Sequence, residues 1–196
     1  MNVSTIDFYN KNAQSYADST ISLDMSNLQE KFIARLPAKA RILDAGCGSG
    51  RDSLLFKSKG FSVTAMDASS ELAKLASATL GQQVICQSFA DINWLCEFDG
   101  VWCMASMLHL NDAELKVALY ECASSLKQGG VFFASFKTGN GEGYDDKGRF
   151  FNYHSMESLR AAFEAEALLK NVTFEYNQDS MGRTDTQWIS VFAEGI

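Results

Sequence analysis

The residues best suited to chemistry lie in one run, Asp44-Ala-Gly-Cys-Gly-Ser-Gly50, which follows the apolar pair Ile42-Leu43. Three glycines at alternate positions predict a tight turn between a strand and a helix, because glycine accepts positive φ and lets a ligand lie against bare main chain. A dinucleotide-binding turn has the spacing G-x-G-x-x-G, which requires glycine at position 51, where this chain has Arg51. The Asp44 carboxylate would also repel a pyrophosphate. The run therefore favours a ligand with a cationic group over an anionic dinucleotide.

A second carboxylate, Asp67, follows the apolar run 61–66 about twenty residues beyond the glycines. At the carboxyl end of a strand, this residue can accept hydrogen bonds from both hydroxyls of a ribose. Hydrogen bonds to a charged acceptor contribute about 1.5–3 kcal/mol each. The alternative is that Asp67 caps the helix expected after Ser69, but Ser69 can fill that role itself, so we favour ribose binding.

His109 is the titratable residue that follows the next long apolar run, 98–104. Its ordinary pKa lies near neutrality, which suits a general base. The alternative is a structural histidine packed beside Leu108 and Leu110. The only other histidine is His154, far away in sequence, and no cysteine pair has the spacing of a zinc site, so we expect no metal.

Strands and helices that alternate along the chain must position these residues. Apolar runs predict strands around residues 42–43, 61–66, 84–86, 98–104, 131–136, 172–176 and 187–192. Helical periodicity predicts a helix containing Ile6, Tyr9, Ala13 and Tyr16, and later helices at 28–36, up to 59, from 69–70, behind Asn111 and at 159–167. Asn111 with Glu114 forms a capping-box pattern, Ser155 is a predicted N-cap, and Gly129-Gly130 is predicted to end a helix. The pattern predicts a doubly wound α/β fold.

Composition restricts the partners of the chain. Its 196 residues fit one domain, 1–196, and its formal net charge of −7 argues against a broad nucleic-acid-binding face. No apolar stretch approaches ~20 residues and no leader pattern is present, so we expect a cytoplasmic protein without membrane contact. Five cysteines without a C-x-x-C pair predict free thiols, most of them buried.

Four motifs in this order resemble the class I S-adenosylmethionine-dependent methyltransferases: Asp44 to Gly50, Asp67-Ala-Ser69, Phe89 to Ile92, and Gly129-Gly130 before a strand. Residues 135–143, with Arg183-x-Asp185-x-x-Trp188, are similar to a tellurite-resistance subgroup. The resemblance implies a Rossmann-like, mostly parallel seven-stranded sheet with an antiparallel last strand and helices on both faces. It also implies S-adenosyl-L-methionine as cofactor and S-adenosyl-L-homocysteine as product.

The resemblance extends to individual cofactor-binding residues. Those expected are Tyr9, Tyr16, Asp44, Gly46, Cys47, Gly48, Ser49, Gly50, Arg51, Asp67, Ala68, Ser69, Ala90, Asp91, Ile92 and Met104. Residues 1–36 are expected to cover the cofactor, with a tyrosine face near the sulfonium, where cation–π attraction contributes ~0.5–2 kcal/mol. The alternatives are helix docking for the tyrosines and helix capping for Asp91. His109 and Tyr16 are the expected catalytic residues.

The acceptor is predicted from what the chain lacks and from one loop. Amine-methylating nucleic-acid enzymes carry Asp/Asn-Pro-Pro-aromatic where this chain has Met104-Ala-Ser-Met107. The loop 137–149, with four glycines, is predicted to be a lid over a small acceptor. Lys137, Tyr144 and Arg183 are the expected substrate residues, and the two cations suit an anion. The alternatives are a solvated linker and ordinary surface charge.

The expected reaction is an in-line displacement on the sulfonium methyl group, in a monomer or homodimer. Two other functions stay open from sequence. One is a catalytically silent adenosylmethionine-binding module, because binding motifs and catalytic competence are separate properties. The other is a nicotinamide-dependent Rossmann oxidoreductase, which the missing glycine at position 51 and the Asp44 carboxylate disfavour.

Overall fold

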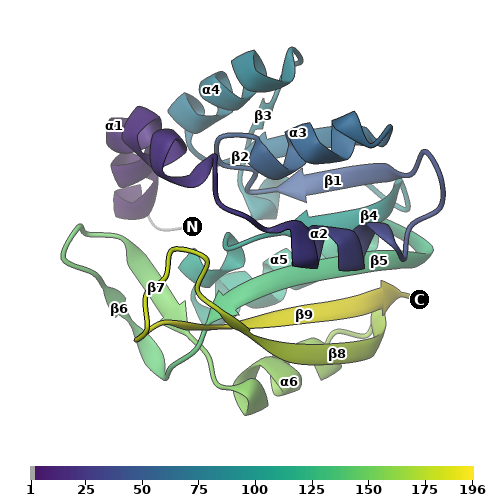
Figure 1. Cartoon of the computed structure of the whole chain (residues 1–196). Coiled ribbons are helices and arrows are strands. Elements are labelled where there is room, and N and C mark those ends of the chain that lie inside the picture. The colour runs from purple at the N-terminus through teal and green to yellow at the C-terminus, as the bar shows by residue number, and fades with distance from the viewer. Residues whose placement is uncertain (1–2) are drawn as a thin grey trace.

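A computed structural model describes residues 3–196, and its centre is a seven-stranded sheet in the order β3-β2-β1-β4-β5-β9-β8 (Figure 1). The strands are β1 (Arg41–Ala45), β2 (Ser62–Asp67), β3 (Ile85–Cys86), β4 (Phe98–Cys103), β5 (Leu126–Lys137), β8 (Leu169–Gln178) and β9 (Gln187–Gly195). Strands β1 to β5 pair in parallel, and β9 runs antiparallel to both β5 and β8. The expected Rossmann-like sheet with an antiparallel last strand is confirmed.

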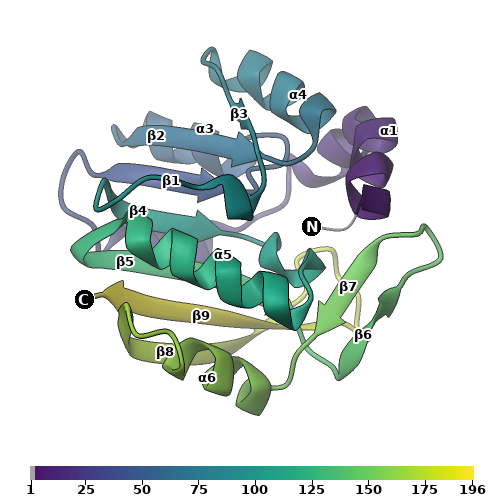
Figure 2. The same cartoon turned by 180° about the vertical axis from the view of Figure 1, so that it is seen from behind.

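Helices cover both faces of this sheet. On one face lie α2 (Ser26–Ile33), α3 (Arg51–Ser58) and α4 (Ser70–Leu80) (Figure 1), and on the other lie α5 (Asp112–Ser125) and α6 (Met156–Glu164) (Figure 2). The long α1 (Val3–Thr20) lies at the carboxyl ends of the parallel strands, where Asn10 Oδ1 accepts a 2.7 Å hydrogen bond from Ser69 Oγ. Ligands of this fold class bind at these strand ends, so α1 lies over the expected site.

Two apolar cores hold the layers together, one on each face of the sheet. Trp102 of β4 is fully buried and stacks on Phe133 at 3.9 Å between ring centroids, with Phe32 and Phe56 packed around it. Aromatic pairs of this kind add about 0.5–1.5 kcal/mol beyond their buried area. The indole of Trp102 is thereby fixed beneath the glycine turn.

The helix caps predicted at Ser69, Ser155 and Asn111 are confirmed, and each joins residues close together in the sequence. Ser69 accepts from the Leu72 amide, Ser155 accepts from the Ser158 amide, and Asn111 and Glu114 form the expected capping box. The prediction for Gly129-Gly130 is wrong. Helix α5 already ends at Ser125, and the glycines lie inside β5, whose register against β4 shifts between Phe98 and Gly100. Gly129, at φ 73°, therefore serves a bulge in the strand.

The loop predicted at 137–149 is mostly a β-hairpin, made by β6 (Gly141–Tyr144) and β7 (Phe150–Tyr153). The Asp145 carboxylate closes its turn by accepting from the amides of Lys147 and Arg149. The hairpin is joined to the first turn of α1, because Thr5 Oγ1 accepts from the Phe150 amide at 2.8 Å. The hairpin and α1 thus face each other across the strand ends (Figure 1).

All five cysteines are free thiols, but only Cys103 and Cys122 are buried. The expectation that most are buried is wrong, because Cys86 and Cys96 lie at the exposed ends of short segments. Within residues 3–196, no helix combines the length and the apolar character that a membrane crossing needs.

Candidate functional site

Two cavities open at the carboxyl ends of the strands, one of about 500 Å³ and one of about 50 Å³. The larger lies between the glycine turn, the α1–α2 connection, the hairpin and the β8–β9 loop. Tyr9, Tyr16 and His109 line both cavities, as do Gly46 and Gly48. The two tyrosines of α1 therefore lie where the cavities adjoin.

Two of the turn glycines are required by their positive φ, and Gly46 is also required by close approach. Gly46 has φ 81°, and a Cβ there would overlap the side chain of Ser106. Gly48 has φ 57°, and a Cβ there would lie 3.5 Å from the Tyr16 ring. The backbone can therefore approach a ligand at these positions, as the sequence predicts.

Asp67 lies at the end of β2 with its carboxylate facing the smaller cavity. It accepts from the amides of Gly48 at 2.9 Å and Ser69 at 2.8 Å, while Ser69 caps α4. Burial raises the pKa of Asp67 to about 6. A carboxylate offers about four acceptor positions, so Asp67 can still accept from two hydroxyls.

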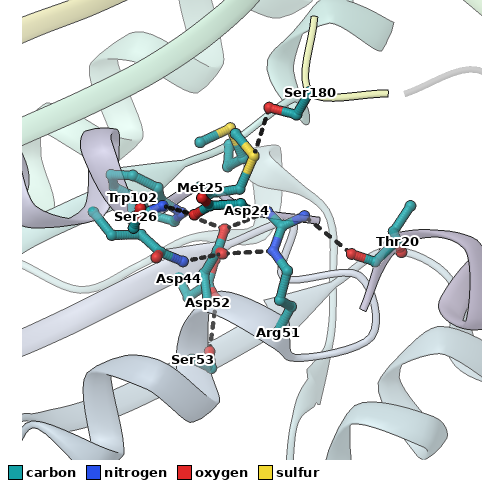
Figure 3. A network of polar contacts seen from close by, with 12 residues as sticks. Thr20, Asp24, Met25, Ser26, Asp44, Arg51, Asp52, Ser53, Trp102 and Ser180 are labelled. Atoms are coloured by element: carbon teal, nitrogen blue, oxygen red, sulfur yellow. Dashed lines mark hydrogen bonds and ion pairs between the residues drawn. The ribbon is translucent and has the colours of Figure 1, made fainter. Parts of the chain in front are cut away.

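The floor of the larger cavity holds charged groups of both signs (Figure 3). Asp44 is buried and accepts from Ser53 Oγ at 2.6 Å. Burial and the nearby charge of Asp52 raise the pKa of Asp44 to about 7. Arg51 lies beside it, with its Nη1 donating to the Thr20 carbonyl at 3.3 Å, where α1 ends.

Asp52 organises this floor, and the sequence prediction missed it. Its carboxylate accepts from Arg51 Nε and Nη2 at 2.7 and 2.9 Å, from Gln29 Nε2 at 2.7 Å, and from Trp102 Nε1 at 2.9 Å (Figure 3). An acid in the first turn of a helix is common, so no sequence pattern distinguishes this buried aspartate from an exposed one.

These residues fit an amino-acid-bearing nucleoside. The α-carbon of such a ligand carries an ammonium and a carboxylate, and one wall of the cavity presents the Asp44 carboxylate and the Arg51 guanidinium. Asp52 occupies the Nε/Nη2 edge of Arg51, and Thr20 takes one N–H of Nη1. One N–H on each of the two Nη atoms therefore remains for a carboxylate.

Tyr9 and His109 form a hydrogen-bonded pair between the two cavities. His109 Nδ1 lies 2.6 Å from the Phe150 carbonyl, which can only accept, so Nδ1 carries the hydrogen. The free Nε2 then accepts from the Tyr9 hydroxyl at 2.9 Å. Burial lowers the pKa of His109 to about 4 and raises that of Tyr9. His109 is therefore neutral at pH 7, and its Nε2 is occupied by the Tyr9 hydroxyl.

Three cations gather at the other end of the larger cavity: Lys137, Arg149 and Arg183. Arg149 was missed as a site residue, although it ends the glycine-rich segment that was predicted to face the site. Tyr144 lines neither cavity, because β6 directs its side chain away, where it is 60% exposed and packs on Phe150. The expectation that Tyr144 contacts substrate is therefore not supported by its position.

Three residues of the segment predicted to surround adenine lie away from both cavities. Ala90, Asp91 and Ile92 line neither cavity. The Asp91 carboxylate instead caps its own turn, η1 (Phe89–Asp91), by accepting from the amide and hydroxyl of Ser88, and Ile92 is buried in the core. The smaller cavity is lined by the residues directly after β3, which are Gln87, Ser88 and Phe89. The strand-end rule that found Asp67 could have found them.

Gly50 also lies outside both cavities, because it starts α3 and packs against Ala76 and Leu80 of α4. The cavities bring the remaining cofactor candidates together: Tyr9, Tyr16, Asp44, Gly46, Cys47, Gly48, Ser49, Arg51, Asp67, Ala68, Ser69 and Met104. Across residues 3–196, no group of three or more His, Cys, Asp or Glu side chains is placed to hold a metal ion.

Comparisons with known proteins agree with this geometry. Residues 42–130 match the family model described as a methyltransferase domain. The putative methyltransferase YqeM of Bacillus subtilis is 30% identical over 79% of this chain and 81% of its own length. A ubiquinone biosynthesis O-methyltransferase of Xanthomonas axonopodis is 42% identical over 54% of this chain, and the match spans 47% of that relative, about half its length.

Solved structures show the same fold. The 1,6-didemethyltoxoflavin-N1-methyltransferase of Burkholderia thailandensis, solved with S-adenosylhomocysteine, superposes with a TM-score of 0.77 at 20% identity. The superposition covers 97% of this chain and 84% of that one. Phosphoethanolamine N-methyltransferase 2 of Haemonchus contortus reaches a TM-score of 0.76 at 14% identity, over 99% of this chain and 61% of that one.

Proposed function

This chain belongs to the class I S-adenosylmethionine-dependent methyltransferases, and from that premise we propose that it methylates a small-molecule acceptor bound in the larger cavity. S-adenosylmethionine is its methyl donor. One observation carries the acceptor proposal: the cavity of about 500 Å³ holds the Tyr9–His109 pair together with charged groups at both ends. Small-molecule sites have volumes of about 300–1,000 Å³. A relative named as a ubiquinone biosynthesis O-methyltransferase supports a small-molecule acceptor.

The donor occupies both cavities in this proposal. Asp67 accepts from the ribose hydroxyls, and Gln87, Ser88 and Phe89 surround the base. Asp44 and Arg51 hold the amino-acid end. Bound S-adenosylmethionine supplies an electrophilic methyl group. The acceptor lone pair forms the new bond to this methyl carbon, and the electron pair of the carbon–sulfur bond stays on sulfur.

The N-terminal helices act as a cap over the donor. Helices α1 and α2, with their connection, supply Tyr9, Tyr16 and residues 23–28 to the cavity walls. The first two residues of the expected cap, 1–36, lie outside the described residues. The Tyr16 ring lies against Gly48, where its face can attract a sulfonium by ~0.5–2 kcal/mol.

Tyr9 and His109 move the acceptor proton. As an acceptor O–H or N–H reacts, its proton passes to the Tyr9 oxygen while the Tyr9 proton passes to His109 Nε2. The Phe150 carbonyl stabilises the imidazolium that forms by accepting from Nδ1. General base catalysis typically contributes about 10²–10⁴-fold, and orienting the acceptor contributes up to ~7–11 kcal/mol.

Ligand-dependent unfolding tests the donor assignment. A ligand at 100 times its dissociation constant stabilises a fold by ~2.7 kcal/mol. We expect adenosylhomocysteine to raise the melting temperature and NADH to leave it unchanged. A shift with NADH and none with adenosylhomocysteine would contradict the proposal.

Turnover tests the acceptor class and the proton path. We expect labelled methyl transfer to small acids, phenols or thiols, and activity confined to tRNA, DNA or folded protein would contradict the proposal. Tyr9→Phe removes the relay hydroxyl, so kcat for an acceptor that loses a proton should fall about 10²-fold or more while adenosylhomocysteine affinity is kept. Tyr120→Phe, on an exposed tyrosine of α5, is the matched control.

A further inference from the structure

The three cations at the acceptor end of the larger cavity are not equivalent. Arg149 forms an ion pair with Asp145 at 2.7 Å, and Arg183 forms one with Asp179 at 2.6 Å. Both guanidinium groups bind their carboxylate through two nitrogens. Among residues 3–196, no carboxylate forms an ion pair with Lys137. Of these three cations, Lys137 is therefore the one whose ammonium group is not paired with a carboxylate and is available to bind an anionic ligand.

Aromatic rings surround the Lys137 ammonium group. Its Nζ lies 4.1 Å from the Phe151 ring centroid and 5.9 Å from the Trp188 ring, and both residues line the cavity. The Trp188 indole is fixed because its Nε1 donates to Asp179 at 2.9 Å. Burial, together with the positive charges of Arg183 and Arg149, lowers the pKa of Lys137 to about 8. An anion placed here would relieve that repulsion.

The same Phe151 ring also contacts His109 of the Tyr9–His109 pair. The His109 ring lies 4.7 Å from the Phe151 centroid, and His109 holds the Tyr9 hydroxyl. Lys137 and the Tyr9–His109 pair thus flank one aromatic side chain. A molecule with its anionic group on Lys137 and its nucleophile at the Tyr9 hydroxyl needs only a few atoms between the two.

We propose that the methyl acceptor is a small organic anion, which Lys137 binds through its negative group within about one aromatic ring of the nucleophile. Arg149 and Arg183 shape this subsite through their own carboxylates and do not clamp the anion directly. The donated methyl joins the nucleophilic oxygen, nitrogen or sulfur, and any proton on that atom leaves through Tyr9 to His109. This proposal rests on the proposed function, because it names the acceptor of the same reaction.

Calorimetry on the full chain tests the subsite in two steps. Adenosylhomocysteine is titrated first, because its failure to bind would overturn the proposed function itself. The loaded protein is then titrated at pH 7 with 2-hydroxybenzoate and 4-hydroxybenzoate, and with the corresponding neutral amides. We expect at least one benzoate to bind about tenfold or more tightly than its amide, as a charge-assisted contact implies. Equal affinity for both amides and their benzoates, or no binding of either benzoate, overturns the inference.

Variants assign the effect to one ammonium group. Lys137→Gln should abolish the preference for the benzoate while leaving adenosylhomocysteine affinity unchanged, and Lys137→Arg should restore the preference. Lys147→Gln, on an exposed lysine in the turn of the same hairpin, should change nothing. An equal loss in the Lys147 variant would assign the effect to general surface charge and overturn the proposal.

A pH profile of the unmutated protein gives an independent readout. Affinity for 2-hydroxybenzoate, whose phenol keeps its proton up to pH 10, should fall as the pH rises through about 8, where Lys137 loses its proton. The total fall should be about the factor that separates the benzoate from its amide. The charged groups that act on it are Arg149, Arg183, Asp145 and Asp179, which keep their charges in this range, and His109, which stays neutral. Lys137→Arg should extend tight binding to pH 10. Affinity that stays constant from pH 7 to pH 10 would contradict the role of Lys137.

Discussion

Two buried aspartates, Asp52 and Asp179, use the same chemistry at opposite ends of the larger cavity. Each accepts two hydrogen bonds from an arginine and one from a tryptophan indole. Two partners of Asp52 lie far from it in sequence: Gln29 belongs to α2 and Trp102 belongs to β4. The partners of Asp179 all lie within residues 181–188, in the β8–β9 loop and at the start of β9.

The difference lies in what each network connects. The Asp52 network ties α2, α3 and β4 together beneath the donor site, so it is part of the global fold. The Asp179 network joins the β8–β9 loop to the start of β9, at the end of the cavity where we propose that the acceptor binds, and its partners are close in sequence. Binding residues are often carried on loops that a rigid scaffold positions. We therefore expect the donor end to be coupled to stability and the acceptor end to be adjustable.

Asp52→Ala tests the global coupling. The change leaves the Arg51 charge, the Gln29 amide and the Trp102 N–H without their acceptor, which should lower the free energy of unfolding by about 3–5 kcal/mol. Urea unfolding measures it. Glu164→Ala, in the exposed pair with Arg160, is the control and should cost under about 0.5 kcal/mol. A loss below about 1 kcal/mol for Asp52→Ala would show that the Asp52 network does not stabilise the global fold.

Arg51→Gln tests whether the Arg51 guanidinium binds the carboxylate in the amino-acid part of the cofactor. We expect adenosylhomocysteine to bind about 1.5–3 kcal/mol more weakly, because a charge-assisted contact to its carboxylate is lost. 5′-Methylthioadenosine lacks that carboxylate and should keep its affinity, which calorimetry can measure. Arg183→Gln should affect neither ligand. Equal weakening of both ligands by Arg51→Gln would indicate a structural role only.

Asp179→Ala tests the local character of the acceptor end. Its partners are close in sequence and partly exposed, so the free energy of unfolding should fall by only about 1–2 kcal/mol. Hydrogen exchange should speed up in residues 179–188 and not in β1 or β4. Adenosylhomocysteine affinity should stay unchanged. Faster exchange across the whole sheet would erase the contrast with Asp52.

Lowering the pH should change the free energy of unfolding in opposite directions through Asp44 at one end of the cavity and Asp179 at the other. Burial raises the pKa of Asp44 to about 7, so the folded state binds its proton before the unfolded state does, and stability rises as pH falls from about 7 to 4. Hydrogen bonds from Arg183 lower the pKa of Asp179, so its contribution is present above pH 3.8 and lost below. Each group changes stability by at most about 1.4 kcal/mol per pH unit.

Unfolding free energies measured between pH 3 and pH 8 check these signs. Asp44→Asn should remove the rise between pH 7 and 6 and reduce the rise between pH 6 and 4, where Asp67, whose pKa burial raises to about 6, also contributes. Asp179→Asn should reduce only the loss below pH 3.8. His109, whose pKa burial lowers to about 4, lowers stability as pH falls below about 6.5, so each variant is compared with the parent protein. A rise between pH 7 and 6 that persists in Asp44→Asn would assign it to another group.

Local rules predicted much of this molecule. The strand–turn–helix around Gly46 and Gly48, the place of Asp67 at the end of β2, and the caps at Ser69, Asn111 and Ser155 all follow from neighbouring residues. Predictions failed where a residue had two local options. Gly129 could serve a bulge as well as a helix end. For Asp91, the structure shows the capping contact with Ser88 that was the alternative to binding adenine.

The sequence by itself determined the family motifs, the order of the strands along the chain and the strand ends at which ligands bind. Only the tertiary structure decided that Tyr9 meets His109, that Asp52 meets Trp102, and that α1 meets the hairpin through Thr5. It also decided that, among residues 3–196, no carboxylate forms an ion pair with Lys137, while Arg149 and Arg183 each have one. The physical reason is separation along the chain: local sequence fixes backbone angles and caps, whereas hydrogen bonds between distant segments depend on how the packed layers bring them together.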